Sequence, residues 1–167
     1  MIFRQWRQVL DGTKTQTRRL WREGDYTWIT PELGAVEPPF VRILEVSRHD
    51  SQDHHRLRWA VGRDYAVQPG RTKKSLGRIK ILEIRRENLQ DITVKDVEAE
   101  GIDVVRHMPL IVPPGTTEER LDALALRVAH GLFEALWDSI NTKKGTRWAD
   151  NPIVWVLAFE FVAGEGR

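Results

Sequence analysis

The chain has 167 residues, of which 41% are hydrophobic and 30% charged, as in an ordinary globular protein, so disorder is not expected. This length suits one domain with a substantial core, and we treat residues 1–167 as a single domain. Cysteine is absent, which excludes disulfides, thiolate metal ligands and a cysteine nucleophile. Arg4, Gln5 and Arg7 stand where a signal peptide needs an apolar core, and no run of about 18 apolar residues is present. We therefore expect a cytoplasmic protein without membrane contact.

The net charge is only +2, but the charges are unevenly distributed. Residues 1–22 contain six basic residues and one aspartate, and residues 63–80 have the same balance, so each block has a net charge of +5. Residues 83–103 contain three basic and seven acidic residues, a net charge of −4. Two basic blocks predict a positive face, which is typical of proteins that bind nucleic acids or nucleotides. The alternative is a solvated surface that binds nothing.

The N-terminal third predicts a helix, a strand and a loop. Apolar residues between Ile2 and Leu10 recur at helical spacing, and Gly12 is placed to end that helix in the left-handed region. Residues 15–20 carry no helical stripe and predict a short strand. Residues 23–39 are rich in glycine and proline and predict a loop.

The next segment predicts one strand followed by a polar stretch. Residues 40–46 alternate in the manner of a strand, and residues 47–58 predict no particular element. This polar stretch contains several metal-ligand residue types, namely His49, Asp50, Asp53, His54 and His55. Adjacent histidines on a polar loop rarely converge on one ion, so we expect neither a metal site nor a cofactor.

In the second half, residues 64–68 and 77–86 alternate and predict strands. Thr93 and Asp96 have the spacing of a capping box, which predicts a short helix that Gly101 ends.

A long helix is predicted over residues 117–141, capped by Thr116 or Thr117. Its apolar stripe comprises Leu121, Leu124, Val128, Leu132, Leu136 and Ile140. We expect Phe133 and Trp137 to belong to the core as well.

Residues 153–162 are apolar on both faces and predict a strand covered on both sides. About five strands and three helices fit an α+β fold built on a small β-barrel.

The most informative segment is residues 12–19, GTKTQTRR. It combines a turn-forming glycine with three cations and three threonine hydroxyls. Arginine offers a fixed fork of donors, lysine a point charge and threonine a short hydroxyl contact, which together suit an anionic or polar planar ligand. A solvated basic strand is the alternative.

This segment resembles the GxKxxExR signature of the ASCH domain, a member of the PUA-like superfamily. Gly12, Lys14 and Arg19 match the signature, whereas its acidic position is Thr17 here. Two later blocks resemble phage and bacterial ASCH proteins, namely residues 87–102 and residues 136–156. Residues 28–58 follow no pattern of the family.

The resemblance implies a PUA-like β-barrel with a cleft beside the signature loop, associated with RNA or modified nucleosides. A cationic cleft attracts phosphates, and an aromatic or arginine plane can stack on a base. Trp21, Trp28 and Trp59 are candidates for such a plane, although tryptophan more often packs in the core.

The resemblance also implies a second function, because some ASCH-like proteins hydrolyse the amide of N4-acetylcytidine-type nucleosides with a lysine, a threonine three residues later and a distant glutamate. Lys14, Thr17 and Glu100 occupy these positions. A lysine whose pKa is lowered by burial and by the neighbouring Arg18 and Arg19 can take the proton from a threonine hydroxyl. In a regular strand Lys14 and Thr17 would face opposite sides, so Lys14 must lie in the turn after Gly12.

We therefore predict a protein that binds RNA or a nucleotide in a cationic cleft. Two alternatives are an amidohydrolase of acylated cytidine, with Lys14, Thr17 and Glu100 as catalytic residues, and a protein-interaction module with neither activity. The predicted ligand-binding residues are Gly12, Lys14, Arg18, Arg19, Lys73 and Lys74. The expected partner is RNA or a modified nucleoside.

Overall fold

The structure is a computed structural model that describes residues 1–31, 41–49, 55–109 and 113–162. Its helices and strands are, in chain order, α1 (Trp6–Leu10), β1 (Gln16–Leu20), β2 (Asp25–Pro31), β3 (Val41–His49), β4 (His55–Ala60), β5 (Asp64–Val67), β6 (Gly77–Asn88), α2 (Val94–Ala99), α3 (Glu118–Asp138) and β7 (Ile153–Val162). Short 3-10 turns follow β6, α2 and α3 at Leu89–Asp91, Val105–His107 and Trp148–Asp150.

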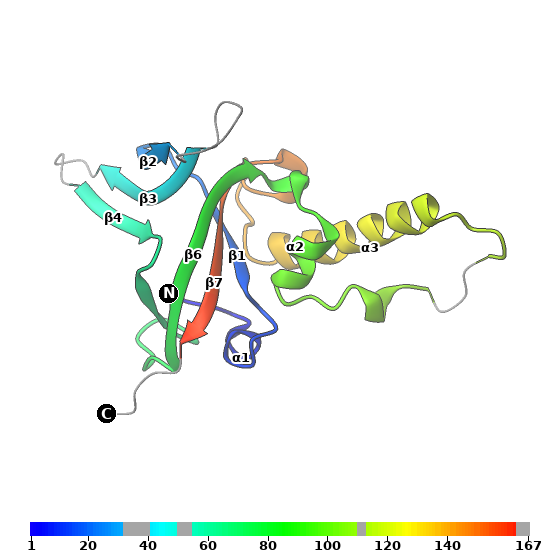
Figure 1. Cartoon of the computed structure of the whole chain (residues 1–167), viewed down its shortest axis with the longest axis horizontal. Helices are drawn as coiled ribbons and strands as arrows, with labels where there is room; N and C mark the ends of the chain where they lie inside the picture. The colour runs from blue at the N-terminus through cyan, green and yellow to red at the C-terminus, as the bar shows by residue number, and fades with distance from the viewer. Residues whose placement is uncertain (32–40, 50–54, 110–112, 163–167) are drawn as a thin grey trace.

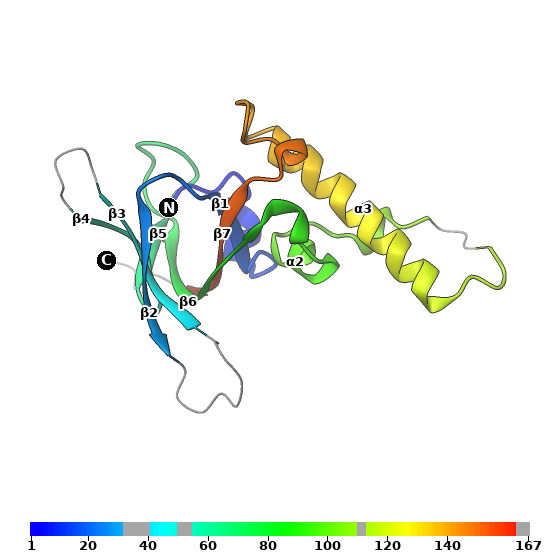
Figure 2. The ribbon, with the colours of Figure 1, turned by 90° about the horizontal axis from the view of Figure 1, so that it is seen from above.

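The strands form two antiparallel sheets, one ordered β1-β7-β6-β5 and the other β2-β3-β4 (Figure 1). Seen from above, the β2-β3-β4 sheet and the helices α2 and α3 lie on opposite sides of β6 and β7 (Figure 2). The mixed α+β class is as predicted, whereas a closed β-barrel is not shown. Within the described residues no strand pairing joins the two sheets.

Strand β7 is central and covered on both faces, as its apolar sequence predicted. Val154 and Val156 pack against the core beneath α2 and α3, whereas Trp155 and Leu157 pack between the two sheets. The sequence of a strand that has neighbours on both sides and apolar layers on both faces is a continuous hydrophobic run. The predicted strands at residues 15–20, 64–68 and 77–86 are likewise confirmed as β1, β5 and β6.

The glycine-rich and polar segments contain strands that the sequence did not predict. Strand β2 occupies part of the predicted loop and pairs with β3, which continues beyond residue 46 to His49 before β4 begins. Neither segment alternates clearly, so pairing with a neighbouring strand determines the conformation where local pattern does not. Residues 32–40 lie outside the described residues, as do Asp50, Asp53 and His54 of the polar stretch in which no metal site is expected.

Helix α2 has the predicted capping box. Thr93 accepts a hydrogen bond from the Asp96 backbone, and the Asp96 carboxylate accepts bonds from the Thr93 backbone at 3.1 Å and the Thr93 hydroxyl at 2.9 Å. Gly101 follows the helix with φ +85, and a Cβ there would lie 3.2 Å from the Lys14 Cβ. The helix end is thus fitted closely against the segment that precedes β1.

Helix α3 is capped by Thr117, one of the two predicted caps, but it presents a different face to the core than the sequence predicted. The buried residues are Ala129, Phe133 and Trp137, so the expected core positions of Phe133 and Trp137 are confirmed. The predicted stripe is only partly buried, and Ile140 is 46% exposed. Each buried residue follows a residue of the predicted stripe by one position. The buried face is therefore rotated by roughly 100° about the helix axis from the predicted face. The aromatic rings remove more area from water than the leucines, which favours this face. No helix in the described part of the chain is long and apolar enough to span a membrane.

The orientation of α3 predicts unequal costs for two truncations. Phe133→Ala empties a buried aromatic site and should lower the free energy of unfolding by about 3–5 kcal/mol. Leu124→Ala, on the predicted stripe, should cost less than about 2 kcal/mol because that side chain is already partly exposed. Urea denaturation of both variants measures the difference. An equal or greater loss of unfolding free energy in Leu124→Ala would show that α3 does not pack through the face that contains Phe133.

The Asp96 cap predicts a specific pH dependence. Partial burial raises the pKa of Asp96, but bonds from Thr93 and Arg85 and the charge of Arg18 outweigh it and lower the pKa from 3.8 to about 2. A depressed folded-state pKa stabilises the protein above the unfolded value, and this contribution is lost as the pH falls through about 2. The stability difference between wild type and Asp96→Asn should therefore be constant above about pH 5 and shrink below it. A difference that does not change with pH would contradict this assignment.

Candidate functional site

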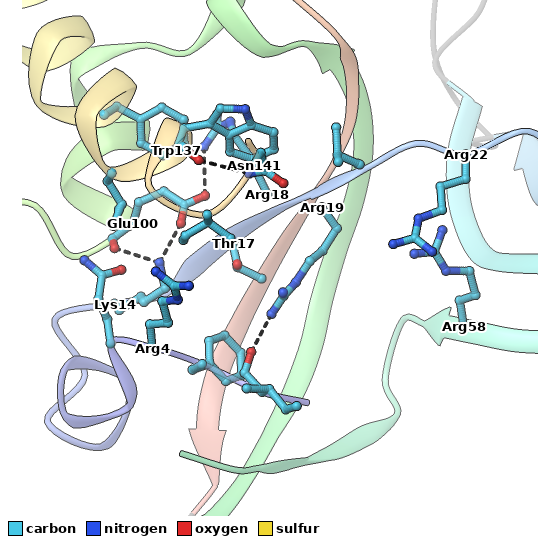
Figure 3. A pocket seen from close by; sticks show the side chains of 17 residues that line it. Arg4, Lys14, Thr17, Arg18, Arg19, Arg22, Arg58, Glu100, Trp137 and Asn141 are labelled. Carbon is cyan, nitrogen blue, oxygen red and sulfur yellow. Dashed lines mark hydrogen bonds and ion pairs between the residues drawn. The ribbon is translucent and has the colours of Figure 1, made fainter. Parts of the chain in front are cut away.

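A cavity of about 300 Å³ lies against β1, the N-terminal segment and the end of α3 (Figure 3). This volume is at the lower end of the range for small-ligand pockets. Phe3, Phe133 and Trp137 supply aromatic lining. Among the described residues that line it, Glu100 is the one carboxylate and six are cations, namely Arg4, Lys14, Arg18, Arg19, Arg22 and Arg58.

The cavity contains a buried ion pair between Lys14 and Glu100, both about 4% exposed. Lys14 Nζ lies 2.5 Å from Glu100 Oε2 and also donates to the Glu100 backbone oxygen at 2.7 Å. Lys14 precedes β1, and its backbone N–H donates to Gln8 at 2.8 Å, while the Thr15 N–H donates to Ala99 at 2.8 Å. These bonds tie the turn after Gly12 to α1 and α2, which brings Lys14 and Thr17 to the same cavity.

Burial lowers the pKa of Lys14. The charge of Glu100 and its hydrogen bond oppose this shift, whereas the charges of Arg19 and Arg18 add to it. Loss of hydration disfavours the ammonium form, and nearby cations disfavour it further. Lys14 is therefore held between a carboxylate that favours its charge and a buried cationic environment that does not.

Arg18 is fully buried, and carboxylates surround its guanidinium. Its Nη2 lies 2.6 Å from Glu87 and 3.4 Å from Asp96, and its Nη1 lies 3.3 Å from Glu100. Nη1 also donates to the Gln16 side chain at 2.9 Å. With its donors occupied, Arg18 anchors Glu100 and the end of α2 to β1, so its structural role is better supported than the predicted ligand contact.

Arg19 is a lining cation with a donor that has no partner among the described residues. Its Nη2 donates to the Ile2 backbone oxygen at 2.9 Å, and its guanidinium lies 5.5 Å from the Phe3 ring centre. Its Nε is buried and has no hydrogen-bond partner among the described residues. Burial lowers the pKa of Arg19, and the charge of Glu100 opposes that shift. A buried N–H without a partner is costly and rare, and it marks a position for an acceptor.

At the other end of the cavity, Arg58 of β4 is held by the fully buried carboxylate of Asp25. Asp25 also accepts bonds from Arg48 at 2.6 Å and 2.9 Å and from the Trp155 indole at 3.0 Å. Because Asp25, Arg48 and Arg58 belong to one sheet and Trp155 to the other, this cluster joins the two sheets beside the cavity. Arg22 stands next to Arg58 in the lining.

The structure brings together part of the predicted residue set. Lys14, Thr17, Arg18, Arg19 and Glu100 line one cavity, and Thr17 is 6% exposed. Gly12 does not line it and instead makes the preceding turn, with φ +81. Lys73 and Lys74 are exposed on the turn between β5 and β6, also outside the cavity lining.

Several lining residues were not predicted, namely Arg4, Arg22, Arg58, Phe3 and Trp137. Arg22 adjoins the basic segment, so an extension of that segment would have included it. Arg58 comes from a stretch with no recognisable pattern and reaches the cavity through tertiary packing alone.

Of the suspected stacking residues, Trp59 is buried between the sheets and Trp21 is packed against the same core. The side chain of Trp28 lies outside the described part.

No protein-family model and no curated protein matches the sequence. Among solved structures, the chain is similar to a crystal structure of an Enterococcus faecalis protein described by the family model DUF984, with a TM-score of 0.51 and 12% identity over 98% of this chain and 74% of the other. It is also similar to an ASCH domain from Lactobacillus crispatus, with a TM-score of 0.42 and 13% identity over 95% of this chain and 70% of the other. The structural neighbours thus include a member of the family that the sequence resembles, and at these identities the likeness concerns the fold alone.

Proposed function

We propose that the cavity binds a nucleotide, either free or as part of an RNA strand. The observation that carries the proposal is the buried Nε of Arg19, which has no partner in the part of the chain that the structure describes. The described lining of its cavity has six cations and one carboxylate. Such a lining attracts anions, and an arginine donor in a partly desolvated site binds a phosphate or carbonyl oxygen strongly. The aromatic lining can pack against a base.

The test is direct binding of ribonucleosides, their 5′-monophosphates and short RNAs by isothermal titration calorimetry. Wild-type protein should bind at least one of these, and Arg19→Gln should weaken the binding by about tenfold or more because a charged donor is lost. Lys73→Gln, which removes a cation outside the cavity, is the matched control and should have little effect. Circular dichroism checks that each variant remains folded.

Salt dependence separates the possible ligand chemistries. If phosphates contribute to binding, the affinity should fall as salt increases. No binding of any probe would overturn the proposal. An equal loss of affinity in Lys73→Gln and Arg19→Gln would indicate that the ligand binds at the exposed turn.

A second candidate function is hydrolysis of an acylated cytidine, favoured by the presence of Lys14, Thr17 and Glu100 in one cavity. In this reaction the Lys14 amine takes the Thr17 hydroxyl proton, and the threonine oxygen attacks the acyl carbon. The donors of Arg19 stabilise the oxyanion, and the proton passes to the departing cytidine amine. Water then cleaves the acyl-threonine ester and releases acetate. Glu100 positions Lys14 throughout.

Acetate release from N4-acetylcytidine tests this candidate. Thr17→Ala should reduce turnover by at least about a hundredfold, whereas Thr17→Ser, which keeps a hydroxyl, should retain part of it. Thr13→Ala removes an exposed hydroxyl from the same segment and is the control. Absence of turnover in wild type, or an active Thr17→Ala variant, would exclude the hydrolase and leave nucleotide binding untouched.

A further inference from the structure

The two arginines at the far end of the cavity form a group separate from Lys14 and Glu100. Arg22 follows β1, Arg58 lies in β4, and both line the cavity. Figure 3 shows their guanidinium groups facing each other, with Arg19 between them and the Lys14–Glu100 pair. Two like charges brought together by different segments repel each other unless an anion lies between them.

The charges of the described residues do not neutralise this group. Asp25 is its carboxylate, but Asp25 is shared between Arg48 and Arg58. Within the described residues Arg22 has no carboxylate within 4.0 Å of its side chain. Among the described residues, three arginines lie against one aspartate, which leaves an excess of two positive charges. Burial lowers the pKa of Arg58 to about 10, with Asp25 opposing the shift and Arg48 and Arg22 adding to it.

Arg58 is also fixed in place, which distinguishes it from a mobile surface cation. Asp25 holds its guanidinium, and the Trp59 ring lies 4.0 Å from it. A guanidinium already fixed in place loses little entropy when it binds a phosphate. Arg22 is exposed and free to close on an anion from the solvent side.

We infer that Arg22 and Arg58 form a phosphate subsite, so that a bound nucleotide places its phosphate between them and its base toward Phe133 and Trp137. This inference rests on the proposed nucleotide binding and specifies a phosphorylated ligand over a neutral nucleoside.

The phosphate has two possible sources with the same chemistry. A neighbouring groove of about 720 Å³ shares Leu20, Arg22, Ile140 and Asn141 with the cavity. Arg22 therefore stands where the cavity meets this groove, which also contains Lys143. A nucleotide with a terminal phosphate would end at Arg22, whereas an RNA strand would continue from its phosphodiester into the groove.

The experiment measures the ratio of dissociation constants for each nucleoside and its 5′-monophosphate by calorimetry. The probes are the four ribonucleosides, N4-acetylcytidine and their monophosphates, with the dinucleotide CpA as the phosphodiester arm. In wild type the monophosphate should bind about tenfold or more tightly than its nucleoside. Arg22→Gln should reduce this ratio by about fivefold or more, because it weakens binding of the monophosphate more than binding of the nucleoside.

Arg71→Gln makes the same charge change on an exposed turn outside the cavity, and it should leave the ratio at the wild-type value. Arg58→Gln, checked for folding by circular dichroism, should reduce the ratio as Arg22→Gln does. Tighter binding of CpA than of cytidine, also lost in Arg22→Gln, would identify a phosphodiester as a ligand.

The outcomes separate the two proposals. Two results would overturn the subsite and leave the proposed function intact. In the first, a nucleoside and its monophosphate bind with dissociation constants whose ratio is near one. In the second, Arg22→Gln and Arg71→Gln change this ratio equally. Failure of every nucleoside and nucleotide to bind would overturn both.

Discussion

The arrangement of the cavity depends on one buried carboxylate, Glu100, held between Lys14 and Arg18. These three residues come from the end of α2, the turn before β1, and β1 itself, so the ion network positions three segments relative to one another. Removing one partner of such a network leaves an uncompensated buried charge and typically costs about 3–5 kcal/mol. The same ion network therefore holds this part of the fold together and positions the Lys14–Glu100 end of the cavity.

A second carboxylate, Asp25, has the same role at the opposite end, where it joins the two sheets and holds Arg58. Between these two anchored ends lies Arg19, whose buried Nε has no partner among the described residues. The molecule thus holds cationic donors in fixed positions without neutralising all of them. Donors that are ordered before the ligand arrives need less reorganisation on binding, which favours affinity for an anionic ligand.

Local patterns predicted the elements whose conformation is decided locally. The Thr93 capping box and the apolar strand β7 needed only short-range chemistry and periodicity to be recognised. The convergence of Lys14 and Glu100, 86 residues apart, came from a family resemblance, because spacing carries no information about such contacts. Pairing between distant strands determines β2, the division of the strands into two sheets and the position of Arg58, so the sequence pattern did not reveal them.

The central claim is that the cavity beside Arg19, and not the exposed basic turn, is the ligand site. A crystal structure of the protein with a bound nucleotide tests it most directly. The account predicts the nucleotide inside the cavity, with an acceptor atom within hydrogen-bonding distance of Arg19 Nε. A nucleotide found on the turn that carries Lys73 and Lys74, with the cavity empty, would contradict it.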